Sequence, residues 1–286
     1  GYNTFVGYDA GGATTTASVN VAIGNNALLT NTTGAQNTAI GANALYSATT
    51  ASDNTAVGHN SLDANTTGHS NTAVGQDALG ANTTASYNTA MGLDSLAANT
   101  TGDQNVAVGA TSSDANTTGR NNTSIGYASL GANTTGDSNT ALGMNALWAN
   151  TTADNNTAVG TSALQSNTTG YDNVAVGSGA LDANTTAHNN SAFGRNALGV
   201  NTTGIQNTAI GYATLDASTT GSYNTSLGSL ALSSNTTASN NTAVGYNSLY
   251  ANTTGNQNVA VGALAGDAIT TGDNNVAIGY QALTTN

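Results

Sequence analysis

One five-residue pattern, Asn, then Thr or Val, then a small residue, an apolar residue and Gly, returns every seventeen residues along the chain without insertion or deletion, with Phe5 and Ser191 as its two departures. In the stretch NTAVGHNSLDANTTGHSNTAVG (54–75), two copies begin at Asn54 and Asn71. We number the unit N-T-A-V-G-x-x-A-L-x-A-N-T-T-G-x-x from position 1 to position 17, and seventeen copies fit, the last cut short. One extra residue would shift all later side chains, so the strict period predicts a solenoid with coils stacked in register.

The residues of the unit predict β-coils rather than helices. Thr, Val, Ile and Asn are mediocre helix formers, Gly recurs within each unit, and the apolar residues do not follow a period of about 3.6 residues. We therefore expect an all-β chain, a parallel β-solenoid (β-roll) of seventeen coils. It is expected to form one domain over residues 1–286, without a polar cap at either end.

Each invariant position suggests its own place in the coil. Position 4 is apolar in every copy and position 9 is Leu in fourteen, so both are expected to face a thin core, with the Thr or Val of position 2 beside position 4. Position 5 is always Gly, which predicts a corner with positive φ or close approach of the next coil. The Asn at position 1 is expected to form a buried amide ladder from coil to coil.

Position 3 is the most informative for assembly. If positions 2 and 4 face the core, position 3 faces outward, yet it is small in every copy except Phe5. An outer surface restricted to small residues suggests close packing against another chain. The candidate interface residues are Ala22, Ala39, Ala56, Ala73, Ala90, Ala107, Ser124, Ala141, Ala158, Ala175, Ala192, Ala209, Ser226, Ala243, Ala260 and Ala277.

The charge of the chain limits the classes of partner that it can bind. The chain has no Lys, Glu, Pro or Cys, only Arg120 and Arg195 as basic residues, and fourteen Asp for a net charge of -12. Two isolated arginines cannot form the basic surface that nucleic acid requires, so no nucleic-acid partner is expected. No apolar run approaches the roughly 20 residues of a membrane helix, so this segment is not expected to insert into a membrane.

No catalytic, cofactor or metal site is expected. His59, His69 and His188 are not at metal-ligand spacing, and none is paired with a nucleophile. Five Asp share position 10 but occur on separated coils: Asp63, Asp114, Asp182, Asp216 and Asp267. The sequence therefore argues against an enzyme.

Two further features concern the outer surface. Trp148 and most Tyr fall at variable positions, and exposed aromatic side chains can stack on sugar rings or anchor protein partners, or cover neighbouring apolar surface. The candidate ligand-contact aromatics are Tyr46, Tyr127, Trp148, Tyr212, Tyr246, Tyr250 and Tyr280. The recurrent Asn-Thr-Thr at positions 12 to 14 is also an N-glycosylation sequon, which needs a secretory route to be used.

The stretches NNVAIGYQAL (274–283), NVAIGNNAL (20–28) and NTAIGYATL (207–215) resemble the head repeats of trimeric autotransporter adhesins, and are also similar to repeats of bacterial and phage tail-fibre-like proteins. The resemblance covers all seventeen coils and is best at positions 1 to 8. It implies a left-handed parallel β-roll, three chains side by side, surface display and adhesion to host matrix or cells. This coil is longer than the family's unit by the Asn-Thr-Thr, and no heptad stalk, neck or anchor barrel is present.

These features lead to one main functional hypothesis and one alternative. The main hypothesis is a structural and adhesive fibre segment at the cell surface or outside the cell. It would assemble with itself as a lateral trimer or end to end, and could contact host matrix or cell-surface glycan. The alternative is an ice-binding solenoid, in which positions 12 and 14 would form outward columns of Asn and Thr. A polysaccharide-binding module is a third, less favoured reading.

Overall fold

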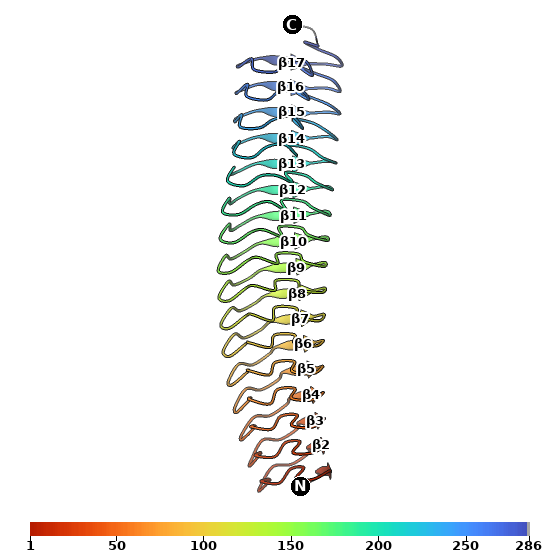
Figure 1. Cartoon of the computed structure of the whole chain (residues 1–286), viewed down its shortest axis with the longest axis vertical. Helices are drawn as coiled ribbons and strands as arrows, with labels where there is room; N and C mark the ends of the chain where they lie inside the picture. Colours follow the sequence, from red (N-terminus) through yellow and green to blue (C-terminus); the bar gives the residue numbers. More distant parts are fainter. Residues whose placement is uncertain (285–286) are drawn as a thin grey trace. The chain divides into compact units, whose positions relative to one another are not determined.

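The computed structural model describes residues 1–284 as an all-β parallel solenoid in which every seventeen-residue unit forms one coil (Figure 1). The chain divides into two compact units, Gly1–Asn139 and Thr140–Asn286. The first contains β1 (Thr4–Val6), β2 (Val21–Ile23), β3 (Thr38–Ile40), β4 (Thr55–Val57), β5 (Thr72–Val74), β6 (Thr89–Met91), β7 (Val106–Val108) and β8 (Thr123–Ile125). The second contains β9 (Thr140–Leu142), β10 (Thr157–Val159), β11 (Val174–Val176), β12 (Ser191–Phe193), β13 (Thr208–Ile210), β14 (Thr225–Leu227), β15 (Thr242–Val244), β16 (Val259–Val261) and β17 (Val276–Ile278).

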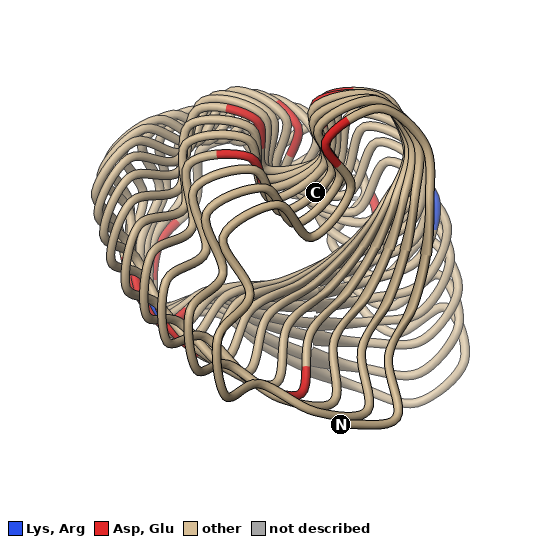
Figure 2. Cartoon of the chain, turned by 90° about the horizontal axis from the view of Figure 1, so that it is seen from below, with Lys and Arg blue, Asp and Glu red and all other residues tan. Residues whose placement is uncertain are grey.

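The strands occupy positions 2 to 4 and pair in parallel, position on position. Ala39 of β3, for example, pairs with Ala56 of β4, and Ala158 of β10 pairs with Ala175 of β11. Viewed along the solenoid axis, successive coils within each of the two compact units have the same outline (Figure 2). The predicted β-solenoid with its seventeen-residue period is confirmed.

The strand faces are the reverse of the prediction: position 3 points into the coil, and positions 2 and 4 point out. Ala39 is fully buried, whereas Ile40 beside it is 37% exposed. The predicted interface residues therefore lie in the core of the single chain, and the prediction that they face a partner is wrong. All are at most 2% exposed: Ala22, Ala39, Ala56, Ala73, Ala90, Ala107, Ser124, Ala141, Ala158, Ala175, Ala192, Ala209, Ser226, Ala243, Ala260 and Ala277.

The reason for small residues at position 3 is the narrow interior. The Leu of position 9 fills it as predicted, and in the described residues the largest fully buried side chains are all leucines of this column. In the first coil, the large and the small side chain have changed places: Phe5 replaces Ala at position 3, and Gly11 replaces Leu at position 9. A Cβ on Gly11 would lie 2.5 Å from the Phe5 ring, so the ring occupies the space that a leucine fills elsewhere.

The corner glycine meets both of its expected requirements. Gly160 has a φ of +133°, and a Cβ on it would lie 2.7 Å from the carbonyl oxygen of Gly177 in the next coil. Only glycine fits so close an approach. The leucines of position 9 also have positive φ, as at Leu62 (51°). This backbone conformation costs an L-residue roughly 1–2 kcal/mol.

The winding is left-handed, as the resemblance implies. In a strand of L-residues that runs upward, a residue whose side chain faces the observer directs its N–H and C=O to the observer's right. Ile23 faces outward, and its carbonyl oxygen accepts the N–H of Gly41 in the next coil at 2.8 Å. Viewed from outside, the next coil therefore lies to the right of an upward strand, and that arrangement is a left-handed coil.

Candidate functional site

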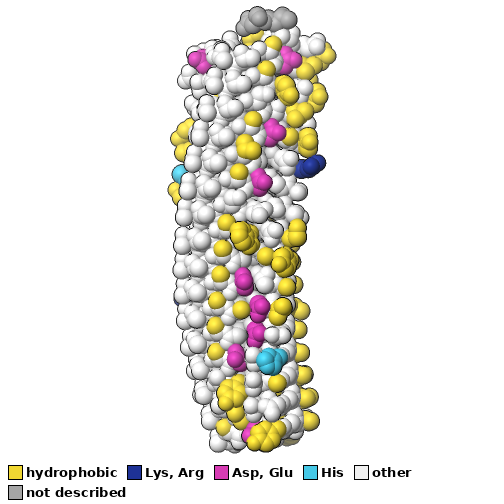
Figure 3. All heavy atoms as spheres, viewed as in Figure 1, with side chains coloured by type: hydrophobic (Ala, Val, Ile, Leu, Met, Phe, Trp, Pro, Cys, Tyr) yellow, Lys and Arg dark blue, Asp and Glu magenta, His cyan; other side chains and the backbone are white. Residues whose placement is uncertain are grey.

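The candidate site is the outer strand face, which we define as the position 2 and position 4 side chains of β1 to β17. Position 2 is half-buried in most coils, and position 4 carries an apolar side chain in every coil. Met91, Leu142 and Phe193 are between 40% and 44% exposed. Hydrophobic side chains recur from coil to coil along the surface shown in Figure 3. Each compact unit thus presents a regular column of apolar side chains at position 4, beside a position 2 column that is mostly Thr, and nothing in the single chain covers the two columns.

Charged side chains are absent from this face in the described residues. The fourteen Asp occupy positions 7, 10, 16 and 17, Arg120 lies at position 16 and Arg195 at position 6. Neutral side chains at positions 2 and 4 mean that a second molecule with the same net charge can approach the face without burying a charge.

Two ladders of asparagine hold the coils behind this face. At position 1, the backbone N–H of Asn37 donates to the Oδ1 of Asn20 at 2.8 Å, and its Nδ2 donates to the carbonyl of Ala51 at 2.8 Å. This ladder confirms the sequence prediction. A second ladder at position 12 was not foreseen: the Nδ2 of Asn82 donates to the Oδ1 of Asn65 at 3.0 Å.

The second ladder changes the interpretation of the Asn-Thr-Thr segment. Asn65 and its equivalents are fully buried, so the prediction of an outward Asn column, which the ice-binding hypothesis requires, is wrong. Within the Asn-Thr-Thr segment, only the Thr of position 14 is exposed. The Nδ2 that a glycan would occupy is the donor of the ladder. A folded coil therefore offers no accessible sequon nitrogen at these buried positions.

In the part of the chain that the structure describes, titratable groups do not gather into a metal site. No group of three or more His, Cys, Asp or Glu could hold a metal ion among these residues. His188 stacks on Tyr171 with ring centroids 4.7 Å apart, and His69 meets Tyr87 edge-on at 4.9 Å. Burial raises the pKa of the carboxyls of Asp63, Asp114, Asp182 and Asp216, partly offset by backbone hydrogen bonds.

The seven aromatic residues proposed as ligand contacts are all exposed, between 37% for Tyr46 and 72% for Tyr280. Arg195 lies over the Tyr212 ring, 5.9 Å from its centroid. Tyr46 lines a hollow of about 350 Å3 with Asn26, Asn43 and Asp63.

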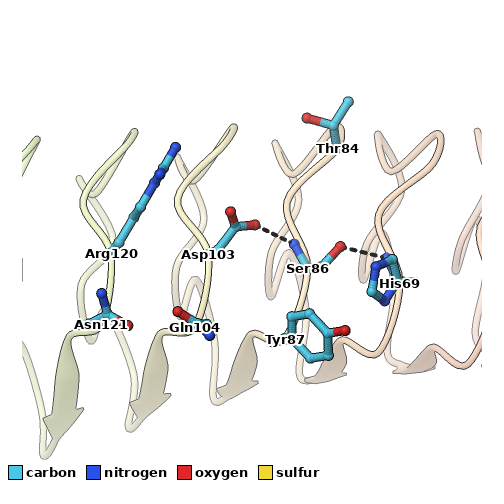
Figure 4. A pocket seen from close by; sticks show the side chains of 8 residues that line it. All are labelled: His69, Thr84, Ser86, Tyr87, Asp103, Gln104, Arg120 and Asn121. Atoms are coloured by element: carbon cyan, nitrogen blue, oxygen red, sulfur yellow. Dashed lines mark hydrogen bonds between the residues drawn. The ribbon is translucent and has the colours of Figure 1, made fainter.

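A second hollow contains an aromatic residue that sequence reasoning missed, Tyr87. The hollow measures about 450 Å3 and is lined by His69, Thr84, Ser86, Tyr87, Asp103, Gln104, Arg120 and Asn121 (Figure 4). Its residues come from positions 14, 16 and 17 of neighbouring coils, and no single unit reveals the combination. Aligning the coils and reading down positions 16 and 17 could have found it.

Comparison with models of known protein families gives no match, and comparison with curated proteins gives none either. The fold thus defines the class, a left-handed parallel β-solenoid, from the chain's own geometry. Among residues 1–284, no helix is long and apolar enough to cross a membrane.

Proposed function

We propose that the chain is a structural module that packs side by side with copies of itself through the outer strand face, as part of an adhesive fibre or shaft at the cell surface or outside the cell. The observation that carries this proposal is an uncovered apolar side chain at position 4 in all seventeen coils. The surface is the reverse of the one expected from sequence, but the proposed role in self-assembly is the same.

A second copy of the chain is the occupant that matches this face. Parallel strands repeat at about 4.8 Å, so only a partner with the same period presents one row of side chains to every row here. The face extends over every strand from β1 to β17, and a stable interface takes roughly 800 Å2 from each partner. The resemblance to trimeric head repeats favours three copies, and the role proposed is structural rather than catalytic.

Charge placed on the face tests this function. In the variant Met91→Lys with Ile125→Lys, two exposed apolar side chains become cationic, and we expect association to weaken about tenfold or more because each ammonium would have to be buried. Sedimentation velocity over a concentration series measures the association.

The matched control is Thr101→Lys with Thr118→Lys, which makes the same change in net charge at exposed position 14 residues. It should associate like the unmodified chain. A chain that sediments as a monomer throughout, or a face variant that associates like its control, would contradict the proposal.

A further inference from the structure

We propose that the hollow around Tyr87 binds a neutral hexopyranose unit of a glycan. Eight residues from four adjacent coils line it, and its volume of about 450 Å3 falls within the range of small-molecule sites. The hollow exists because Ser86 is short, whereas His69, Asp103 and Arg120 at the same unit position of neighbouring coils are long. Ser86 therefore forms the floor, and its neighbours form the walls.

The walls supply the chemistry that a sugar ring requires. A pyranose has an apolar face of C–H groups and a rim of hydroxyls, so it binds where an aromatic ring adjoins planar hydrogen-bonding groups. Tyr87 is 57% exposed, and Figure 4 shows its ring at the lower side of the hollow. Gln104 and Asn121 lie in the same row, and the Arg120 side chain extends toward the coil of Asp103.

Two of the polar side chains, Asp103 and Ser86, are already held in place by hydrogen bonds. Asp103 Oδ1 accepts the backbone N–H of Ser86 at 2.7 Å, and Ser86 Oγ accepts the backbone N–H of His69 at 3.1 Å. The edge-on contact between His69 and Tyr87 limits the motion of the tyrosine ring. Side chains fixed before binding lose less conformational freedom when a ligand arrives.

Charge favours a neutral sugar over an acidic one. Asp103 and Arg120 offer an acceptor and a donor of opposite charge within one hollow, which suits a pair of neighbouring hydroxyls. The chain as a whole carries a net charge of -12, which repels anionic ligands. Arg120 and Asp103 thus serve as hydrogen-bonding partners for sugar hydroxyls rather than as a binding site for a charged ligand.

Saturation-transfer NMR tests the site on the full chain with methyl glycosides of glucose, galactose, mannose and glucuronic acid as probes. We expect at least one neutral hexoside to bind in the millimolar range, and Tyr87→Ala to weaken its binding about tenfold or more through loss of ring stacking. Asp103→Asn keeps an oxygen to accept the Ser86 N–H, and should weaken the same binding by removing the charged acceptor.

The matched control is Tyr223→Ala. Tyr223 occupies the same unit position and is 53% exposed, but its position 16 neighbours are Ile205, Ser222 and Ser239, without charge. This variant should bind the sugar like the unmodified chain. Three outcomes would overturn the site: no hexoside binds, only the glucuronide binds, or Tyr87→Ala and Tyr223→Ala have the same effect. Circular dichroism of each variant verifies that the coils remain folded.

Discussion

At the scale of single residues, size rather than polarity decides which strand position faces inward. Position 4 is the more apolar, and the sequence pattern alone favours it as the core position. In coils with Leu at position 9, that leucine and the two asparagine ladders already fill the interior, so only a methyl or hydroxymethyl group fits at position 3. The alternation of a strand shows which positions share a face but does not show which face is inside.

Two neighbouring residues of β11 test this assignment. Ala175→Leu forces a larger side chain into the filled interior, and we expect it to lower the free energy of unfolding by about 1–3 kcal/mol. Val176→Leu places the same side chain on the outer strand face and should change the free energy by less than about 0.5 kcal/mol. Urea denaturation compares the two. Equal effects would mean that the faces are assigned wrongly.

Exceptions to the repeat contain information that could have revealed the correct orientation from sequence. Phe5 and Gly11 depart from the consensus in the same coil, and so do Gly266 and Ile269. In the latter coil, a Cβ on Gly266 would lie 3.1 Å from the Ile269 side chain. Large and small residues exchanged between two positions of one coil indicate that both positions share the same interior.

At the scale of the coil and its neighbours, buried amides make the regular stacking possible. The Gly34 carbonyl accepts hydrogen bonds from Asn20 and Asn31 at 2.9 Å each, so the two ladders meet at one oxygen. The first ladder was predictable from an invariant Asn at a bend. The second was not, since a sequon with two following threonines looks like an exposed corner. The positive φ values at Leu62 and Tyr87 were also hidden, because neither residue type favours that conformation.

Removing an Asn from the position 12 ladder should lower the free energy of unfolding, and adding an Asn where one is missing should raise it. Asn99 Nδ2 donates to Asn82 and Gly102, and Asn99 Oδ1 accepts from Asn116. Asn99→Ala removes these three hydrogen bonds and takes from the buried Asn82 Oδ1 its Asn99 donor, so it should destabilise the chain by about 1–3 kcal/mol.

The matched gain is Ala48→Asn, which fills a natural gap in the same ladder and should stabilise the chain by about 1 kcal/mol. Where Ile269 interrupts the ladder, Asn252 Oδ1 has no hydrogen-bond partner. Chemical denaturation of both variants tests the pair, and an Asn99→Ala chain as stable as the unmodified one would show that the ladder contributes nothing.

At the scale of the whole molecule, the acidic side chains lie outside the outer strand face, at positions 7, 10, 16 and 17. Burial raises the pKa of the Asp63, Asp114, Asp182 and Asp216 carboxyls above the ordinary value of 3.8, so the folded chain binds these protons more tightly than the unfolded chain does. The free energy of unfolding therefore rises as the pH falls from neutral through the raised pKa values. Protonation also weakens the self-repulsion of a net charge of -12.

Urea denaturation at pH 7 and at about pH 4.5 measures this dependence, and the chain should be more stable at the lower pH. Replacement of the four aspartates by asparagine removes their titration and should flatten the dependence. If the unmodified chain is less stable at the lower pH, burial does not govern these carboxyls.

The Asn column at position 1 has a consequence for how such a chain can change over time. Each coil contacts the coil before it and the coil after it through the same amide hydrogen bonds. Deleting or duplicating one whole seventeen-residue unit therefore brings equivalent surfaces together again. A gain or loss that is not a multiple of seventeen residues would break the column. The length of such a solenoid can therefore change in steps of one coil while every contact between neighbouring coils stays the same.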